Sequence, residues 1–267
     1  MASRLHHGDI VLSHFSLPLT TPFPERVAAA ASAGFDGMGW YVRDYVDHLD
    51  RGWTDERLGN VLADHDMIIH EIDSLPLERL ALKDAAIHMA RLFGARNLQV
   101  QGDYPTTEPD AAAEIARIAD AVAPFDINVS IEFVGNKNIR SADDALRLAD
   151  MSGRPNVGVQ VDIWHHVRGA NDWPMLERLD HRRIVSVQFD DGPVAPIDPD
   201  YTRDTVLYRC PPGEGEMDVD RFLRTVYPAS LDLPLSMEVI SAELNAVPVE
   251  VAARRIADAT RAVLARQ

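Results

Sequence analysis

Residues 128–163 read NVSIEFVGNKNIRSADDALRLADMSGRPNVGVQVDI and contain a β-branched run, an Ala- and Leu-rich stretch with helical spacing, and a second β-branched run. Ser141 precedes Asp143 and Asp144, so a hydroxyl cap and negative charge stand where the helix would begin. Gly153 is the residue type that ends helices. The segment therefore predicts a strand, a helix and a second strand.

The same alternation extends along the chain, and we count about eight strand–helix units, the number that a closed barrel requires. The predicted strands cover residues 10–15, 34–40, 67–72, 97–101, 128–133, 157–163, 184–189 and 235–240. The predicted helices cover residues 24–33, 54–65, 77–93, 108–123, 141–151, 174–179, 218–227 and 249–266. Because no Ser/Gly- or Pro-rich linker divides them, we expect residues 1–267 to form one (β/α)8 TIM barrel domain.

The composition of the chain limits which binding partners and which cellular location we expect. The chain carries 42 acidic and 26 basic residues, a formal charge of −16, so nucleic acid and anionic membranes are not expected partners. A single cysteine, Cys210, excludes an internal disulfide and a cysteine-based metal site. We find neither a signal peptide nor a membrane-spanning run, so the expected location is the cytoplasm.

Four predicted strand ends carry a polar residue where an apolar one would be expected: Glu132, Asp162, Gln188 and Glu238. A single strand-end glutamate usually solvates the rim of a barrel or pairs with an arginine. Several buried carboxylates that converge need a cation to neutralise them. We therefore predict that these four side chains bind one divalent metal ion, with Mn²⁺ or Mg²⁺ favoured and Co²⁺, Zn²⁺ or Fe²⁺ as alternatives.

Other polar or aromatic residues lie at the predicted catalytic rim. Trp40 ends the second predicted strand and would stack on a sugar, or else pack under a loop. His70 and Glu71 end the third and would line the pocket, or else pair with each other. Gln101 ends the fourth and has the same two readings, substrate binding or structure. The long connection over residues 190–216 follows a strand, so it is expected at the catalytic face.

The segment Asp162-Ile-Trp-His165 resembles the Asp-x-x-His element of the xylose-isomerase-like barrel superfamily, and Glu132, Gln188 and Glu238 extend the resemblance. The superfamily includes ketose 3-epimerases, inosose isomerases and dehydratases, and endonuclease IV. Many members have histidine where this chain has Gln188. The resemblance implies a sugar isomerase or epimerase of carbohydrate metabolism, and a homodimer or homotetramer.

The resemblance also implies roles for individual residues. Glu132 and Glu238 would remove and return a proton next to the carbonyl of a polyhydroxy substrate, through an enediolate. His165 and Arg209 would bind substrate oxygens. A dehydratase is the nearest alternative, because the same enediolate can expel a hydroxyl group. A non-catalytic sugar-binding barrel and a DNA-repair nuclease are further alternatives, and the acidic charge opposes the nuclease.

Overall fold

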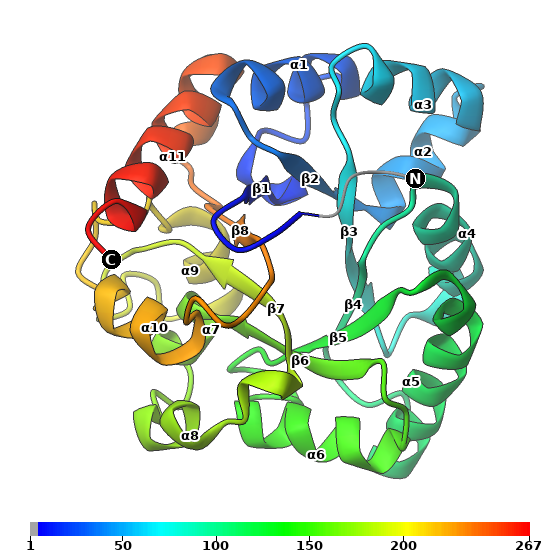
Figure 1. Ribbon diagram of the computed structural model, residues 1–267, viewed down its shortest axis with the longest axis vertical. Coiled ribbons are helices and arrows are strands. Elements are labelled where there is room, and N and C mark those ends of the chain that lie inside the picture. The colour runs from blue at the N-terminus through cyan, green and yellow to red at the C-terminus, as the bar shows by residue number, and fades with distance from the viewer. Residues whose placement is uncertain (1–4) are drawn as a thin grey trace.

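The computed structural model describes residues 5–267, which form a closed barrel of eight parallel strands, each paired with the next and β8 with β1 (Figure 1). The predicted (β/α)8 class is confirmed. The strands are β1 Ile10–Leu12, β2 Gly37–Tyr41, β3 Ile69–Pro76, β4 Asn97–Gln101, β5 Asn128–Glu132, β6 Val157–Asp162, β7 Ile184–Phe189 and β8 Leu235–Met237.

Helices surround the barrel (Figure 1). They are α1 Phe23–Ala33, α2 Val42–Asp50, α3 Asp55–Ala63, α4 Lys83–Phe93, α5 Glu108–Val122, α6 Ala142–Ser152, α7 Ile163–Arg168, α8 Trp173–Arg178, α9 Tyr201–Leu207, α10 Val219–Val226 and α11 Val249–Leu264. The sequence pattern did not predict α2, α7 or α9. Both α7 and α9 are shorter than two full helical turns, too short to show a clear helical period.

Side chains alternate along the strands between an apolar shell and a polar interior. Val129, Ile131, Val159 and Val161 are fully buried in the apolar core. Polar residues that alternate with apolar ones form hydrogen bonds between neighbouring strands. The hydroxyl of Ser130 donates to Gln160 at 3.1 Å, and the amide of Gln99 donates to Glu132 at 2.7 Å. Because successive strand residues point to opposite faces, the helices cover the apolar face and the barrel interior is lined with polar groups.

Strand β3 differs from its predicted bounds of 67–72, because it begins at Ile69 and continues to Pro76. Its pairing with β4 is irregular between Ile72 and Leu75, and Ser74 has a φ of 55°. Period-2 alternation breaks at such an irregularity, which hides the second half of the strand from the pattern. His70 and Glu71 therefore lie near the start of β3, not at its end as predicted.

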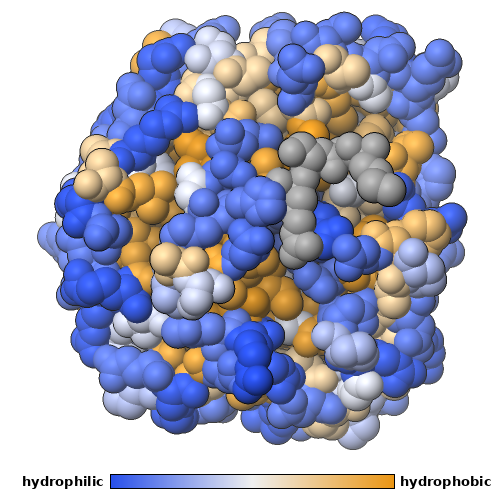
Figure 2. Space-filling view, viewed as in Figure 1, coloured by the Kyte–Doolittle hydropathy of each residue, from blue (hydrophilic) through white to orange (hydrophobic). Residues whose placement is uncertain are grey.

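The surface is mainly hydrophilic. Figure 2 shows hydrophilic residues over most of one face, with apolar residues in small patches between them. Large apolar residues that are exposed come from separate elements, for example Leu49 of α2, Leu92 of α4 and Val251 of α11. Over residues 5–267, none of the helices combines the length and apolar character needed to span a bilayer.

Candidate metal centre

Four buried side chains converge where β5, β6 and β8 end. Glu132, Asp162, His165 and Glu238 each offer one ligand atom, and these atoms all lie within 4.8 Å of one another. Glu132 ends β5, Asp162 ends β6, and Glu238 directly follows β8. The structure thus brings together three of the four predicted ligands, and it adds His165, which was predicted only as a catalytic and substrate-binding residue.

Gln188, the fourth predicted ligand, lies beside this group. It is fully buried on β7 and is the register partner of Asp162. Its amide nitrogen donates to a Glu238 carboxylate oxygen at 3.4 Å, whereas its amide oxygen is buried without a hydrogen-bond partner among residues 5–267. Leaving a buried acceptor unsatisfied costs about 1–3 kcal/mol. A cation beside this oxygen would remove that cost, so Gln188 remains a predicted ligand.

The short helix α7 positions His165. A carboxylate oxygen of Asp162 accepts from the backbone N–H of Trp164 at 2.7 Å and so starts the helix. Nε2 of His165 then lies 3.8 Å from Asp162 and 3.9 Å from Glu132, while Nδ1 contacts the hydroxyl of Tyr201 at 2.9 Å. Burial lowers the pKa of His165 to about 4. The imidazole is therefore neutral at pH 7, the form that can bind a metal ion.

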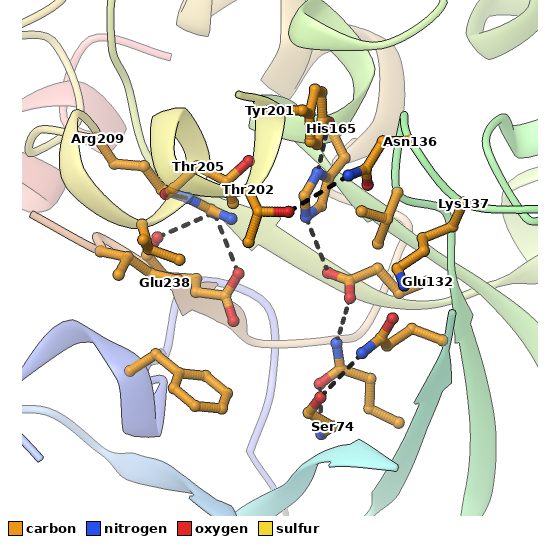
Figure 3. A pocket seen from close by; sticks show the side chains of 16 residues that line it. Ser74, Glu132, Asn136, Lys137, His165, Tyr201, Thr202, Thr205, Arg209 and Glu238 are labelled. Carbon is orange, nitrogen blue, oxygen red and sulfur yellow. Dashed lines mark hydrogen bonds and ion pairs between the residues drawn. The ribbon is translucent and has the colours of Figure 1, made fainter. Parts of the chain in front are cut away.

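Arg209 reaches the same carboxylates from the segment that follows α9. Its Nη1 lies 3.1 Å from Asp162, 2.5 Å from Asp190 and 3.1 Å from a carboxylate oxygen of Glu238. Only 2% of the residue is exposed, and within the described part of the chain its buried Nη2 has no hydrogen-bond partner. Figure 3 shows the guanidinium beside Glu238. Nη1 is thus engaged by the protein, and Nη2 remains for the predicted contact with substrate.

Negative charge exceeds positive charge in this cluster. Burial, with Glu238 and Asp162 nearby, holds the pKa of Glu132 well above its usual range. Burial raises the pKa of Glu238 to about 8 although Arg209 opposes the shift. Such shifts report carboxylates that lack sufficient countercharge. Carboxylate oxygens with an imidazole and an amide oxygen fit a hard or borderline divalent ion.

Stability of the ion-free protein should fall as pH rises from 6.5, above which the opposing effect of the buried neutral His165 is complete, to about 8. A carboxyl that titrates near 4.5 when unfolded and near 8 when folded keeps its proton longer in the folded state. The stability that it contributes is present below 4.5 and is lost as pH rises through about 8. Urea unfolding at a series of pH values with a chelator present would measure this slope. Stability that is flat or rising over this interval would contradict it, and Mn²⁺ should flatten the slope.

A cavity of about 240 Å³ opens directly above the cluster (Figure 3). Three predicted substrate-binding residues, Gln101, His165 and Arg209, line it, as do Glu132 and Glu238. Its remaining lining comes from the turn after β1, from β3, β4, the segment after β5, α9 and the segment after β8: Phe15, Ser74, Gln99, Val134, Asn136, Lys137, Tyr201, Thr202, Thr205, Val206 and Ile240.

Trp40, His70 and Glu71 do not line this cavity, and each has a structural role instead. Trp40 is fully buried, stacks on Phe23 at 4.1 Å between ring centroids and donates from Nε1 to Asp44 at 2.8 Å. His70 is buried with Nε2 3.4 Å from the side chain of Asn97, and Glu71 accepts from Ser236. His70 and Glu71 lie outside the cavity because they stand at the start of β3, away from the strand end where the cavity opens.

The cavity residues that the sequence pattern missed come mainly from α9. Tyr201, Thr202 and Thr205 all lie on this helix, which sits inside the long segment between β7 and α10. Asp200 caps the helix by accepting from the N–H of Arg203 at 3.0 Å. An aspartate followed by three non-proline residues was the available signal, but the prolines nearby obscured it.

Asp191 organises the segment between β7 and α10. Its carboxylate accepts from four backbone N–H groups, those of Gly192 at 2.7 Å, Gly213 at 2.9 Å, Gly215 at 3.0 Å and Met217 at 3.0 Å. A Cβ on Gly215 would lie 2.3 Å from that carboxylate, so a larger residue does not fit there. One side chain therefore fixes both ends of the segment that carries α9 and Arg209.

Asp191→Ala should destabilise the protein by about 3 kcal/mol, because several buried N–H donors lose a charged acceptor. Backbone hydrogen exchange at Gly213, Gly215 and Met217 should accelerate more than exchange in the barrel strands. The Asp191→Asn variant keeps one carbonyl acceptor. Its stability and exchange rates should therefore lie between those of the unsubstituted protein and of Asp191→Ala. Unchanged exchange in this segment would show that Asp191 does not hold it.

Comparison with known proteins agrees with this architecture. Residues 27–264 match the family described as xylose isomerase-like TIM barrel. The chain is 23% identical to a 3-dehydroshikimate dehydratase of Pseudomonas putida over 93% of its own length and 40% of that protein. It is 26% identical to an inosose isomerase of Bacillus velezensis over 58% of its length and 55% of that protein. It thus spans about half the length of these curated relatives.

Solved structures share the fold. The structure of the IOLI protein with a binding zinc atom superposes with a TM-score of 0.83 at 16% identity, covering 97% of this chain and 98% of that one. A D-allulose 3-epimerase from Methylomonas sp. in complex with D-allulose superposes with a TM-score of 0.76 at 16% identity, covering 100% and 99%.

Proposed function

This chain belongs to the xylose isomerase-like TIM barrel family, and from that membership we propose that it is a divalent-metal-dependent isomerase or epimerase of a small polyhydroxy carbonyl compound. One observation carries the proposal: three carboxylates and a neutral imidazole offer ligand atoms within 4.8 Å of one another, at the base of a cavity of about 240 Å³. That volume suits a molecule of sugar size.

The proposed ion is held by Glu132, Asp162, Gln188 and Glu238, with His165 as a further donor. Such an ion supplies Lewis-acid polarisation of a bound carbonyl. Mn²⁺ and Mg²⁺ suit the oxygen donors. A ligand set that includes the imidazole favours Zn²⁺, Co²⁺ and Fe²⁺ more than the four predicted oxygen ligands alone would. The related structure with a binding zinc atom supports metal binding by a protein of this fold.

Glu132 and Glu238 are the proposed acid–base pair. They come from β5 and β8, strands that are not neighbours in the barrel, so their carboxylates reach the cavity from different sides. One removes the proton next to the substrate carbonyl and the other returns a proton to the opposite face. Charge that develops on the substrate oxygen would be stabilised by the unpartnered Nη2 of Arg209, and by Nε2 of His165 where that nitrogen does not bind the ion.

Mass spectrometry in deuterated water tests the activity. The Mn²⁺-loaded protein is incubated with inososes and ketoses, and the products are weighed. Uptake of deuterium without loss of water is the expected result. Substrate binding without exchange at any tested metal would favour a non-catalytic sugar-binding barrel and overturn the proposal.

A metal-dependent dehydratase is the second candidate. The match to a 3-dehydroshikimate dehydratase favours it, because that match covers 93% of this chain. The hydroxyl of Tyr201, held 2.9 Å from Nδ1 of His165, offers a proton to a leaving hydroxyl group. Loss of water from the product in the same experiment would identify this reaction. A homo-oligomer, dimer or tetramer, remains a prediction that light scattering would test.

A further inference from the structure

The two cations that line the cavity are already neutralised by carboxylates of the protein. Nη1 of Arg209 contacts three of them, those of Asp162, Asp190 and Glu238. At the opposite rim, Nζ of Lys137 lies 3.0 Å from Asp103. The same nitrogen lies 3.6 Å from Glu78.

The formal charge around the cavity therefore stays negative even with an ion bound. Four carboxylates face Arg209 and a divalent ion: Glu132, Asp162, Asp190 and Glu238. Two more carboxylates face Lys137. The four carboxylates exceed the positive charge of Arg209 and the ion by one, and the two carboxylates exceed that of Lys137 by one. An anionic substituent on the ligand would therefore be repelled at both ends of the cavity.

The start of α9 does not supply the missing positive charge at this rim. This helix carries Tyr201 and Thr202 into the cavity. Asp200 accepts from the N–H of Arg203 there, so a carboxylate already occupies the helix N-terminus. A phosphate or carboxylate would have to displace it.

Apart from the apolar side chains of Phe15, Val134, Val206 and Ile240, the lining groups that remain are neutral hydroxyl, amide and imidazole groups. The amide of Gln101 donates to the hydroxyl of Ser74 at 3.2 Å, and the amide of Asn136 donates to the hydroxyl of Thr202 at 3.3 Å. Each hydroxyl can both donate and accept, and each amide retains further capacity. These groups match the hydroxyls of an uncharged ligand.

We infer that the cavity selects an uncharged polyhydroxy carbonyl compound over a carboxylated or phosphorylated one. The inference rests on the proposed function and narrows its substrate class. It separates the substrates named by the two kinds of relative, because an inosose is neutral and 3-dehydroshikimate carries a carboxylate. The carboxylates that pair with Lys137 and Arg209 produce this selectivity, because their excess negative charge repels anions.

Calorimetry on the Mn²⁺-loaded protein tests the inference independently of turnover. The probes are myo-inositol, a neutral cyclitol, and quinate, a carboxylated cyclic polyol, each also titrated into metal-containing buffer. We expect myo-inositol to bind at least tenfold more tightly than quinate. Equal affinity, tighter quinate binding or no binding of either probe would overturn the inference.

A double substitution tests the proposed cause. Glu78→Gln with Asp103→Asn removes two negative charges and keeps the carbonyl acceptors, so Lys137 becomes a free cation. Affinity for quinate should rise at least tenfold, while affinity for myo-inositol changes less than twofold. Asp126→Asn, which removes a remote exposed carboxylate paired with Arg96, should change neither. Unchanged quinate affinity in the double variant would overturn the role of these pairs.

The two proposals fail in different ways. If myo-inositol binds preferentially but no inosose or ketose exchanges a proton, the proposed reaction fails and the selectivity stands. If a carboxylated ketone exchanges protons or loses water faster than its neutral counterpart, the reaction chemistry stands and the selectivity fails.

Discussion

Glu238→Gln should lower proton exchange by about 100-fold or more, the usual contribution of a general acid–base group. The substitution keeps the size of the side chain and its hydrogen bond with Ser13, but removes the charge that faces Asp162 and Arg209. A neutral amide is also a weaker ligand than a carboxylate, so Mn²⁺ occupancy should fall. Exchange in deuterated water and metal analysis of the same samples would measure both effects.

Glu243→Gln is the matched control. Glu243 follows β8 as well, but its side chain is 69% exposed and pairs with Arg255 outside the cavity. Its substitution should change exchange less than twofold. If Glu238→Gln keeps full metal content and full exchange, Glu238 has no part in the proposed centre. If the variant keeps its metal and loses only exchange, the acid–base role stands and the ligand role does not.

The strand ends were predictable because burial and polarity conflict there. Glu132 and Asp162 stand in β-branched runs where a buried charge is costly, and this conflict is visible without coordinates. The repeated pattern of strand and helix likewise fixes the order of elements, and parallel strands bring their carboxyl ends to one edge. The barrel and the convergence of three of the four predicted ligands follow from these two facts.

Residues whose roles depend on irregular backbone were not predictable. Ser74 reaches the cavity only because β3 continues past an irregularity, and Tyr201 only because α9 folds back over the barrel end. Asp190 was visible in the sequence, but its ion pair with Arg209 spans a segment with no periodicity. Strand alternation says nothing about how such a segment returns to the barrel.

The position of Arg209 connects the metal cluster with stability. Its guanidinium contacts carboxylates from β6 and from the ends of β7 and β8, and it also donates to the backbone oxygen of Glu238 at 3.1 Å. Arg209 and the proposed divalent ion would together neutralise these groups. Removing either cation should therefore make the free energy of unfolding depend more strongly on the other cation.

Arg209→Met should lower the free energy of unfolding of the ion-free protein by about 3–5 kcal/mol, the cost of leaving buried charges without a partner. Mn²⁺ at about 100 times the dissociation constant of the unsubstituted protein should stabilise that protein by about 2.7 kcal/mol and Arg209→Met by more, because the ion binds only the folded state and the variant leaves it more uncompensated negative charge to neutralise. Arg255→Met removes an exposed arginine that pairs with Glu214 and Glu243, so it should cost less than about 1 kcal/mol and show no added dependence on Mn²⁺. Urea unfolding with and without Mn²⁺ measures all three proteins. Equal losses in the two variants would mean that Arg209 does not neutralise the cluster.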